Sequence, residues 1–378
     1  MNNYRKFNLA VLSVSFPGLL ACGLFNIVID PYDIFNSYEL PGVNQLKTEK
    51  FKNLKLFKAI DITKIKPKTI FLGSSRAGIG LNPTHPAIVN QPAYNLALSG
   101  GNIYESKLYF KHALANQPEL KTVVLGIDLF MFNELKVNEL DLNEERLEIS
   151  NILPQDLLSI TLSLDAIYAS ANTIKSNRYP NAYHLFKENG MHYTSYSERH
   201  PPQIINRFKK SISEYFKTDG YYKEYHLSNE FLSDLQEIVS VCKQRNVDIK
   251  IFISPSHATQ WEAARAAGLW SLFEEWKREV VEIIPVWDFS GYNSITAEPI
   301  SEDMKNYWDS SHYRKEVGDL VLNRLFHYQE ETVPDDFGVL ITPTNVDDHL
   351  AQIRTEQASW VEKNLDEVKF VEDLKSEK

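Results

Sequence analysis

A short apolar run near residue 70 ends in a glycine and two serines: Thr69-Ile70-Phe71-Leu72-Gly73-Ser74-Ser75. Apolar and β-branched residues bounded by a turn signal are typical of a buried strand that feeds a tight turn. Because polar residues do not alternate with apolar ones, both faces of the strand should be covered, as in a parallel sheet. The stretch therefore predicts an α/β fold with a serine at the carboxyl end of a strand.

Similar apolar runs recur along the chain and alternate with helical patterns. Strands are expected over 94–98, 122–128, 249–253 and 286–289, and helices over 103–116, 228–245, 260–280 and 314–328. This alternation predicts a doubly wound, three-layer α/β/α fold around a parallel sheet. Sites in such sheets lie beyond the carboxyl ends of the strands. The loops that carry Ser75, Gly100-Gly101 and Asp128 should therefore hold the chemistry.

One long stretch, residues 134–230, interrupts the alternation and is interpreted as an insertion. It holds an amphipathic helical part and then a polar part rich in Tyr and His. Because it leaves the sheet directly after Asp128, we expect it to lie over the strand ends near Ser75. The expected organisation is an anchor (1–30), a connector (31–66), an α/β domain with the insertion (67–330) and an acidic C-terminal tail (331–378).

The N-terminal segment is apolar enough to cross a bilayer. Arg5 and Lys6 precede a mostly apolar run at residues 9–29, about 31 Å of helix at roughly 1.5 Å per residue. The basic flank favours an orientation with the N-terminus inside and everything after Asp30 outside. We therefore expect an uncleaved, single-pass signal anchor. Three alternatives stay open: a cleaved signal peptide, a lipoprotein signal ending at Cys22, and a buried helix.

The composition excludes several classes of function. The net charge is −10 at neutral pH, and an acidic surface repels phosphate backbones, so no nucleic-acid partner is expected. Two cysteines, Cys22 and Cys242, rule out a disulfide framework and a cysteine metal cluster. The spacing of His184, His192 and His200 fits no compact ligand motif. We expect neither a metal nor another cofactor.

Two separate segments carry residues that suit nucleophilic catalysis. Ser75 sits on a glycine-containing turn, where its hydroxyl can be exposed and backbone N–H groups can face an oxyanion. A hydroxyl nucleophile needs a base, and the base needs an orienting acid. Asp309 and His312, three residues apart before the last predicted helix, can supply both. Each segment alone is equally typical of a helix cap.

Taken together, three motifs resemble the SGNH/GDSL hydrolase-like superfamily. They are Gly73-Ser74-Ser75-Arg76, Asn95-Leu96-Ala97-Leu98-Ser99-Gly100-Gly101 and Asp309-Ser310-Ser311-His312. The resemblance covers about 67–130 and 248–328. It is closest to uncharacterised, membrane-anchored bacterial members, which look similar to periplasmic proteins that O-acetylate alginate and other surface polysaccharides. It implies a flavodoxin-like arrangement of the sheet and a location in a bacterial inner membrane, with the main domain on the periplasmic side.

The resemblance also assigns roles to residues. Ser75 is the expected nucleophile, His312 the base and Asp309 its orienter. Gly100 or Gly101 would donate an oxyanion N–H beside that of Ser75. Arg76, next to the nucleophile, could bind a substrate carboxylate, and an ion pair within the domain explains it equally well. His257, which also follows a strand, is the alternative base.

The sequence departs from the family pattern in two places. Ser74 stands where an aspartate usually precedes the nucleophile. Asp128 stands where an asparagine usually donates to the oxyanion, and an ionised carboxylate cannot donate. Either Asp128 is protonated, or Asn102 or Asn133 replaces the missing donor, or catalysis is impaired.

Two functions therefore compete. The first is an ester hydrolase or O-acyltransferase that works through acyl-Ser75 on a cell-envelope polysaccharide or glycolipid. Its partners would be an acyl donor, a sugar or glycolipid acceptor, and in one version a membrane-bound acyltransferase. The second is an inactive envelope protein that binds carbohydrate or assists assembly, as Asp128 suggests. Under the first, Ser75 Oγ and a ring nitrogen of His312 should lie about 2.6–3.2 Å apart.

Overall fold

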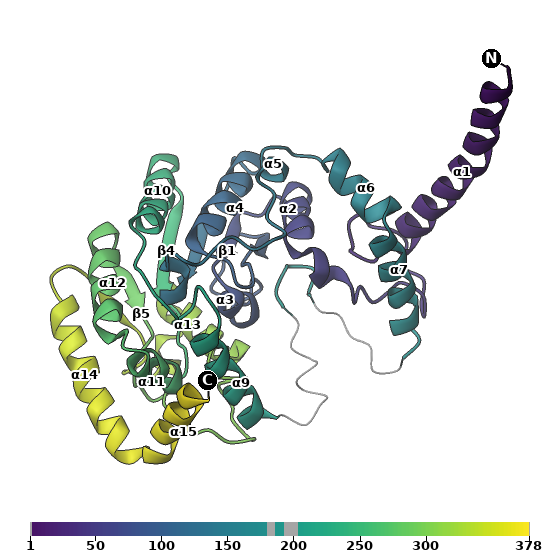
Figure 1. Cartoon of the computed structure of the whole chain (residues 1–378). Helices are drawn as coiled ribbons and strands as arrows, with labels where there is room; N and C mark the ends of the chain where they lie inside the picture. The colour runs from purple at the N-terminus through teal and green to yellow at the C-terminus, as the bar shows by residue number, and fades with distance from the viewer. Residues whose placement is uncertain (1, 180–185, 193–202, 378) are drawn as a thin grey trace. The chain divides into compact units, whose positions relative to one another are not determined.

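The computed structural model describes residues 2–179, 186–192 and 203–377, which form two compact units (Figure 1). Unit 1 comprises residues 1–64 and 143–187, and unit 2 comprises residues 65–142 and 188–378. Each unit has an apolar core of its own. The chain thus leaves unit 2 after residue 142, near the start of the predicted insertion, and returns to it at residue 188.

Unit 2 is built on one six-stranded sheet. Its strands are β1 (Thr69–Leu72), β2 (Ala93–Asn95), β3 (Thr122–Ile127), β4 (Asp248–Ile253), β5 (Val286–Asp288) and β6 (Val339–Ile341). The order is β2-β1-β3-β4-β5-β6, and only the β5–β6 pair is antiparallel. Every residue of β1 and β3 is buried. The prediction of an α/β fold with a mostly parallel sheet is therefore confirmed.

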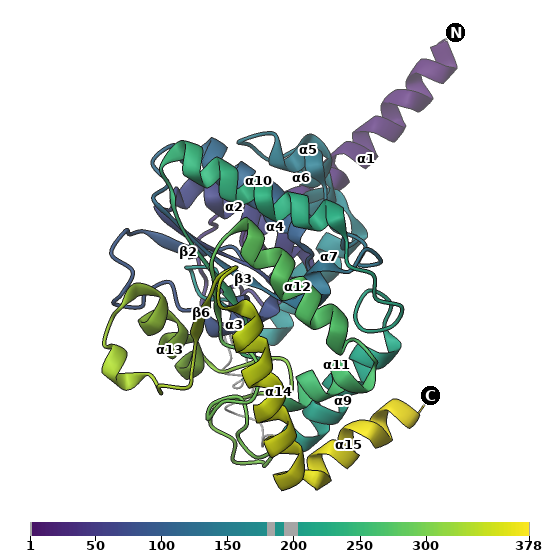
Figure 2. The same ribbon diagram turned by 90° about the vertical axis from the view of Figure 1, so that its left-hand side faces the viewer.

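Helices fill the connections between these strands. In unit 2 they are α3 (Ser75–Gly80), α4 (Ile103–Asn116), η2 (Leu129–Phe132), α9 (Ile204–Lys217), α10 (Asn229–Arg245), α11 (Ala258–Ala266), α12 (Trp270–Ile283), α13 (Lys315–Phe326), η3 (Glu330–Thr332), α14 (Val346–Lys363) and α15 (Leu365–Ser376). Helices α4, α10 and α12 lie side by side (Figure 2). The single helix predicted over 260–280 is two helices, because Gly268 adopts a positive φ of 83° between them.

The C-terminal region is part of unit 2 and is not a separate tail. β6 pairs with β5, and α14 and α15 then pack against α12 and α11. Their acidic composition hides an apolar face at helical spacing. The buried residues of that face include Val346, Leu350, Ile353, Trp360, Val368, Val371 and Leu374. The boundary predicted at residue 330 therefore has no counterpart in the structure.

Unit 1 contains the N-terminal helix and the first part of the predicted insertion. Its helices are α1 (Asn2–Ile29), η1 (Lys50–Asn53), α2 (Leu54–Ile65), α5 (Glu144–Leu147), α6 (Pro154–Leu162) and α7 (Leu164–Ser176). The second part of the predicted connector, residues 50–65, is thus helical, and Phe57 and Ile60 contribute to the unit 1 core. The predicted connector and the first part of the predicted insertion thus share one core. Each of these two segments supplies several of its apolar residues.

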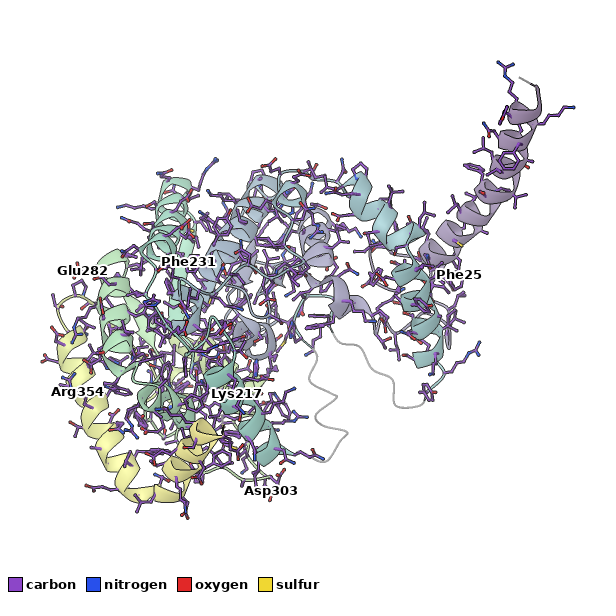
Figure 3. All side chains as sticks on the ribbon, in the orientation of Figure 1. Phe25, Lys217, Phe231, Glu282, Asp303 and Arg354 are labelled. Carbon is purple, nitrogen blue, oxygen red and sulfur yellow. The ribbon has the colours of Figure 1, made fainter. Side chains whose placement is uncertain are left out.

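Helix α1 is long and apolar enough to span a membrane, as predicted for the N-terminus. Along most of its length its side chains are exposed, and Phe25 projects from it in Figure 3. Its last two turns pack against α6 and α7. Asn26, which is fully buried there, donates to the Thr161 carbonyl (2.7 Å) and accepts from the Ser170 hydroxyl (2.7 Å). This polar contact fixes the end of α1 within unit 1.

Backbone geometry places the Ser75 turn at the point where the strand order reverses. β1 lies between β2 and β3, and ligands bind beyond the carboxyl strand ends at such a reversal. Gly73 has a φ of 133°, and an added Cβ would lie 2.5 Å from the Gly126 carbonyl oxygen. Its own carbonyl accepts the Leu98 N–H at 2.8 Å. Only glycine fits here, so the turn is held against both neighbouring strands.

A second glycine contact brings α3 onto α13. An added Cβ at Gly318 would lie 1.9 Å from the Gly80 carbonyl oxygen. An added Cβ at Gly80 would lie 1.9 Å from the Tyr313 ring. The two helices therefore touch backbone to backbone. Because Ser75 begins α3 and His312 precedes α13, this contact sets how closely those two residues approach.

The variant Gly318→Ala should separate α3 from α13. The added methyl group meets a backbone carbonyl that cannot turn aside, so we expect a loss of about 1–3 kcal/mol in the free energy of unfolding. Chemical denaturation measures this loss. Glu316→Ala, an exposed position on the same helix, is the control and should leave stability unchanged. Equal stability of Gly318→Ala and wild type would contradict the close helix contact.

Candidate active site

The residues predicted to form a catalytic relay lie together in unit 2. Ser75 Oγ is 2.8 Å from His312 Nε2. His312 Nδ1 is 2.8 Å from Asp309 Oδ2 and 3.1 Å from Oδ1. The predicted contact between Ser75 and His312, which are far apart in the chain, is therefore present. The His312 and Asp309 side chains keep 25% and 17% of their surface exposed, and Ser75 is half-buried.

Asp309 organises its own loop. Its Oδ1 accepts the backbone N–H groups of Ser311 (2.7 Å) and His312 (2.9 Å). Burial acts to raise the pKa of Asp309, but His312 and these two donors outweigh it, so the net pKa lies below the usual value. The group is thus a carboxylate, which requires a proton on His312 Nδ1. That tautomer leaves a lone pair on Nε2 facing the Ser75 hydroxyl.

The serine turn is the start of a short helix. Ser74 is the N-cap of α3, and its Oγ accepts the Arg76 N–H at 3.2 Å. Ser75 is the first residue of the helix, and its own N–H is one of the donors that a helix start leaves free. Within the part of the chain that the structure describes, this N–H has no acceptor. It is therefore available to an oxyanion.

Arg76 and Asp128 form a buried ion pair below Ser75. Arg76 Nη1 donates to Asp128 Oδ1 at 2.7 Å, and Ser74 Oγ donates to Asp128 Oδ2 at 2.6 Å. Both charged side chains are almost completely buried. The roles suggested for them in substrate contact are therefore not supported, because each is occupied by the other. Of the two explanations for Arg76, the ion pair within the domain is the one that the structure contains.

The remaining donors of Arg76 reach two further segments. Nε donates to Ser311 Oγ at 3.0 Å, and Nη2 donates to the Tyr215 hydroxyl at 2.7 Å. Burial acts to lower the pKa of Arg76, but Asp128 more than offsets this, so the pKa is raised and the guanidinium stays charged. Burial raises the pKa of Tyr215, which stays a neutral phenol. The guanidinium thus joins the serine turn, β3, α9 and the His312 loop.

The candidate oxyanion donors differ in what they already bond. Gly101 N–H donates to the Leu98 carbonyl at 3.3 Å within a turn. Gly100 adopts a φ of 70°, and its N–H has no acceptor among the described residues. Of the two glycines, Gly100 is therefore the better candidate. Its convergence with the Ser75 N–H on one point stays a prediction.

The two asparagines considered as replacement donors are both engaged. Asn102 Nδ2 donates to the Lys136 carbonyl and to Asn138 Oδ1, each at 2.9 Å. Asn133 Nδ2 donates to the Tyr221 carbonyl at 3.1 Å. Asp128 accepts from two donors, Arg76 and Ser74. Oxyanion stabilisation would therefore depend on backbone N–H groups.

The alternative base, His257, has a structural role instead. Its Nδ1 contacts Thr259 Oγ1 at 2.8 Å, and its Nε2 contacts the Glu298 carbonyl at 2.6 Å. Burial lowers its pKa to about 4, so it is neutral at ordinary pH. Both ring nitrogens are used within the core. His257 is therefore no candidate for proton transfer from Ser75.

Some neighbours of the site were not anticipated. Sequence patterns identified neither Tyr215 nor Ser311 as partners of Arg76. His192, considered only as a metal ligand, donates its backbone N–H to the Gly78 carbonyl at 2.9 Å, one turn along the helix from Ser75. His184 and His200 lie outside the described residues. Among the described residues, no group of three His, Cys, Asp or Glu side chains is arranged to hold a metal.

A part of the predicted insertion does contact the loops of the site. α9 supplies Tyr215 to Arg76, and its Ser211 accepts from the Ser310 hydroxyl at 2.9 Å. The earlier part, residues 143–187, belongs to unit 1. α9 thus contacts the loops of the site, only residues 143–187 of the predicted insertion belong to unit 1, and the expectation that the insertion lies over the strand ends stays a prediction.

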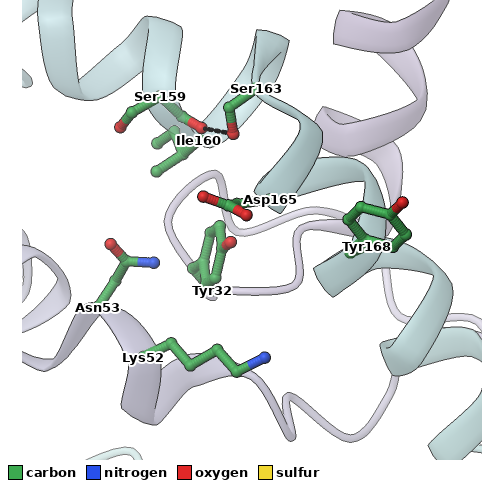
Figure 4. Close-up of a pocket in the computed structure, with 8 residues that line it drawn as sticks. All are labelled: Tyr32, Lys52, Asn53, Ser159, Ile160, Ser163, Asp165 and Tyr168. Atoms are coloured by element: carbon green, nitrogen blue, oxygen red, sulfur yellow. Dashed lines mark hydrogen bonds between the residues drawn. The ribbon is translucent and has the colours of Figure 1, made fainter.

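A separate cavity of about 330 Å³ belongs to unit 1 and holds none of these residues (Figure 4). Its lining is mainly polar and comprises Tyr32, Lys52, Asn53, Ser159, Ile160, Ser163, Asp165 and Tyr168. Asp165 and Tyr32 face one another across it. The cavity is therefore distinct from the Ser75 site in both residues and unit.

No model of a known protein family matches the chain, and no curated protein matches it. The function is therefore argued from the geometry of the site.

The variant Asp128→Asn separates two roles for this position. If Asp128 braces Arg76, losing its charge leaves a buried guanidinium without a carboxylate, and unfolding should become easier by roughly 3 kcal/mol. If the position only lacks an oxyanion amide, the new amide should instead raise activity. Chemical denaturation measures the change in the free energy of unfolding, and the rate of ester hydrolysis measures the change in activity. Glu377→Gln, which removes an exposed partner of Lys209, is the control and should change neither.

Proposed function

We propose that unit 2 is a serine ester hydrolase or O-acyltransferase of the SGNH/GDSL type, with its sheet covered in the three-layer arrangement of that superfamily. One observation carries the proposal: Ser75, His312 and Asp309 form a continuous relay with contacts of 2.8 Å. Chance packing rarely aligns a hydroxyl, an imidazole and a carboxylate in this order. The strand order and the Ser75 turn at its reversal support the same reading.

The relay accounts for each proton in an acyl transfer. Ser75 Oγ attacks the carbonyl carbon of an ester while His312 Nε2 takes the hydroxyl proton. The ester bond breaks, His312 returns that proton to the leaving alcohol, and acyl-Ser75 remains. A sugar hydroxyl or water then attacks the carbonyl carbon of acyl-Ser75 and loses its proton to His312. The bond between that carbon and Ser75 Oγ breaks, and His312 returns the proton to Ser75 Oγ. Asp309 holds the imidazole and stabilises its charged form.

The oxyanion site is weaker than the resemblance implies. The Ser75 and Gly100 N–H groups are its proposed donors, and Asp128 adds none. Loss of a single oxyanion donor lowers the rate by roughly 10²–10³-fold. We therefore expect a slow enzyme. The preference for transfer or hydrolysis depends on which acceptor reaches acyl-Ser75.

The proposed setting is the outer face of a bacterial inner membrane. Helix α1 would span the bilayer, with Arg5 and Lys6 at the inner side and unit 2 in the periplasm. An acyl group from a donor, or from a membrane-bound acyltransferase, would pass to a cell-envelope polysaccharide or glycolipid. The substrate class rests on the resemblance to periplasmic O-acetylation proteins.

A second candidate function has one observation in its favour. Asp128 is locked by Arg76 and Ser74, so it cannot supply the side-chain donor of the family pattern. A protein that keeps the fold without turnover would serve as a carbohydrate-binding or assembly module of the envelope. The two candidates differ in whether Ser75 is nucleophilic.

A serine-directed fluorophosphonate probe should label the wild-type protein covalently. Labelling should disappear in Ser75→Ala and in His312→Ala, because one lacks the nucleophile and the other its base. Ser233→Ala, which removes an exposed hydroxyl on α10, is the control and should label like wild type. Mass spectrometry locates the adduct. Absence of labelling in folded wild type would support the non-catalytic alternative.

The variant Asp309→Asn should lower kcat for p-nitrophenyl acetate by about 10⁴-fold with little change in KM. The amide cannot hold the proton on Nδ1, so the wrong tautomer faces Ser75. Asp303→Asn, an exposed aspartate of the preceding loop, is the matched control and should keep full activity. Steady-state kinetics test this, and an equal kcat for Asp309→Asn would remove Asp309 from the relay.

A further inference from the structure

The bend between α6 and α7 exposes an unusual number of apolar side chains. The two helices meet at Ser163 with a bend of 53°. Leu158, Leu164 and Tyr168 keep 55%, 73% and 68% of their surface exposed, and Leu157 and Leu162 are also exposed. We call residues 157–168 the α6–α7 bend. A contiguous apolar surface of this kind marks a contact with another apolar phase.

The bend lies directly against the end of α1. An added Cβ at Gly23 would lie 3.2 Å from Leu162 Cδ2, so Leu162 packs on that glycine. Asn26 bonds Thr161 on α6 and Ser170 on α7, so it joins α1 to both helices. The exposed leucines of the bend therefore continue the apolar surface of α1. On α1 itself, Leu24 and Val28, which lie close to Gly23 in the sequence, are also exposed.

The length of α1 sets the depth of this contact. A hydrocarbon core of about 30 Å takes about 20 helical residues. Counted from Phe7, the first residue after Lys6, that length reaches Asn26. Leu162 faces Gly23, which is about one helical turn, or roughly 5 Å, inside that limit. If α1 spans the bilayer, the bend therefore reaches the outer boundary of the hydrocarbon.

The polar groups of the bend are arranged for such a boundary. Ser163 caps α7 by accepting the Ala166 N–H at 3.0 Å, so this donor of the first turn is satisfied within the bend. Asp165 faces the polar cavity, opposite Tyr32 (Figure 4). Asp156 is paired with Arg146 through bonds of 2.8 and 2.9 Å. Apolar side chains thus project outward at the bend, while Asp156 is buried in its pair with Arg146 and the exposed Asp165 lies at the polar cavity.

We propose that the α6–α7 bend inserts into the outer leaflet beside α1, as an interfacial element that does not cross the membrane. The occupant of its apolar face is the lipid bilayer, since the face is continuous with the surface of a helix of membrane length. A depth of about 5–10 Å is the usual range for such elements. The inference rests on the proposed spanning role of α1. It gives unit 1 a second contact with the membrane.

Depth measurements on the full-length protein in lipid vesicles test this inference. In a Cys22→Ala background, single cysteines replace Leu164, Lys175 or Leu12 and carry an environment-sensitive fluorophore. Cys242 is fully buried and should not react. Quenching by nitroxide-labelled lipids reports contact with the hydrocarbon, and quenching by aqueous iodide reports contact with water. Lys175 is the matched control, because it lies on α7 about 16 Å further along the helix.

The label at Leu164 should be quenched severalfold more by lipid nitroxide than by iodide, and the label at Lys175 should show the reverse. Iodide quenching at Leu164, or protection from both quenchers, would overturn the inference, because the face would then be in water or covered by protein. Lipid quenching at Lys175 would also overturn it, in favour of a full span. Leu158→Cys repeats the measurement if Leu164→Cys does not fold.

The label at Leu12 distinguishes this inference from the proposed anchor. Lipid quenching at Leu12 with iodide quenching at Leu164 leaves the anchor intact and removes only the bend. If neither label meets lipid, both the anchor and the inference fail. Fluorophosphonate labelling of the same samples reports the Ser75 chemistry separately.

Discussion

The buried guanidinium of Arg76 is the contact on which the rest of the site depends. It bonds Asp128 after β3, Ser311 in the His312 loop and Tyr215 on α9. Removing a charge from water carries a penalty of several kcal/mol, which is repaid only when its partners are all in place. The four segments therefore cannot take up their positions independently. Ser75 and His312 lie in contact because the residues next to them in the chain, Arg76 and Ser311, are hydrogen-bonded to each other.

The same pair gives the acid at position 128, where the SGNH/GDSL resemblance would place an asparagine, a structural role. An asparagine at position 128 would donate to an oxyanion but would leave Arg76 without its counter-charge. Asp128 accepts from Arg76 and Ser74 together, so it braces the serine turn. Ser74 likewise replaces an acid that would repel Asp128. The two positions at which the sequence departs from the SGNH/GDSL pattern, Ser74 and Asp128, thus belong to one hydrogen-bond network. This network holds the serine turn in place, where the pattern would instead have a side chain that donates to the oxyanion.

The sequence predicted those parts of the structure that depend on local pattern. β1, β3 and β4 appear as continuous apolar runs, and the Asp309–His312 spacing places both groups on one short loop. Contacts across long separations leave no such signature. The sequence around Tyr215 has no motif that would identify it as a partner of Arg76. Which of the tyrosines contacts Arg76 depends on how α9 packs in the fold. The acidic C-terminal region predicts a helical final segment, but its many charges mask the narrow apolar face by which α14 and α15 join unit 2, and the three-residue strand β6 is too short to leave a pattern.

The packing of α1 bears on the fate of the N-terminal segment. Gly23, Asn26 and Ile29 form the face of α1 that contacts the rest of unit 1, and Asn26 satisfies two groups of α6 and α7. Cleavage after residue 29 would strip the Thr161 carbonyl and the Ser170 hydroxyl of their partner, at about 1–3 kcal/mol for each buried group left unpaired. This favours a retained helix over a cleaved signal peptide. Processing at Cys22 would keep Gly23, Asn26 and Ile29 in the protein. The contacts of α1 with the rest of unit 1 are therefore the same for an anchor and for a lipoprotein. The two differ in the exposed, mostly apolar residues 9–21, which a signal anchor needs to cross the bilayer and which make no part of the packed face.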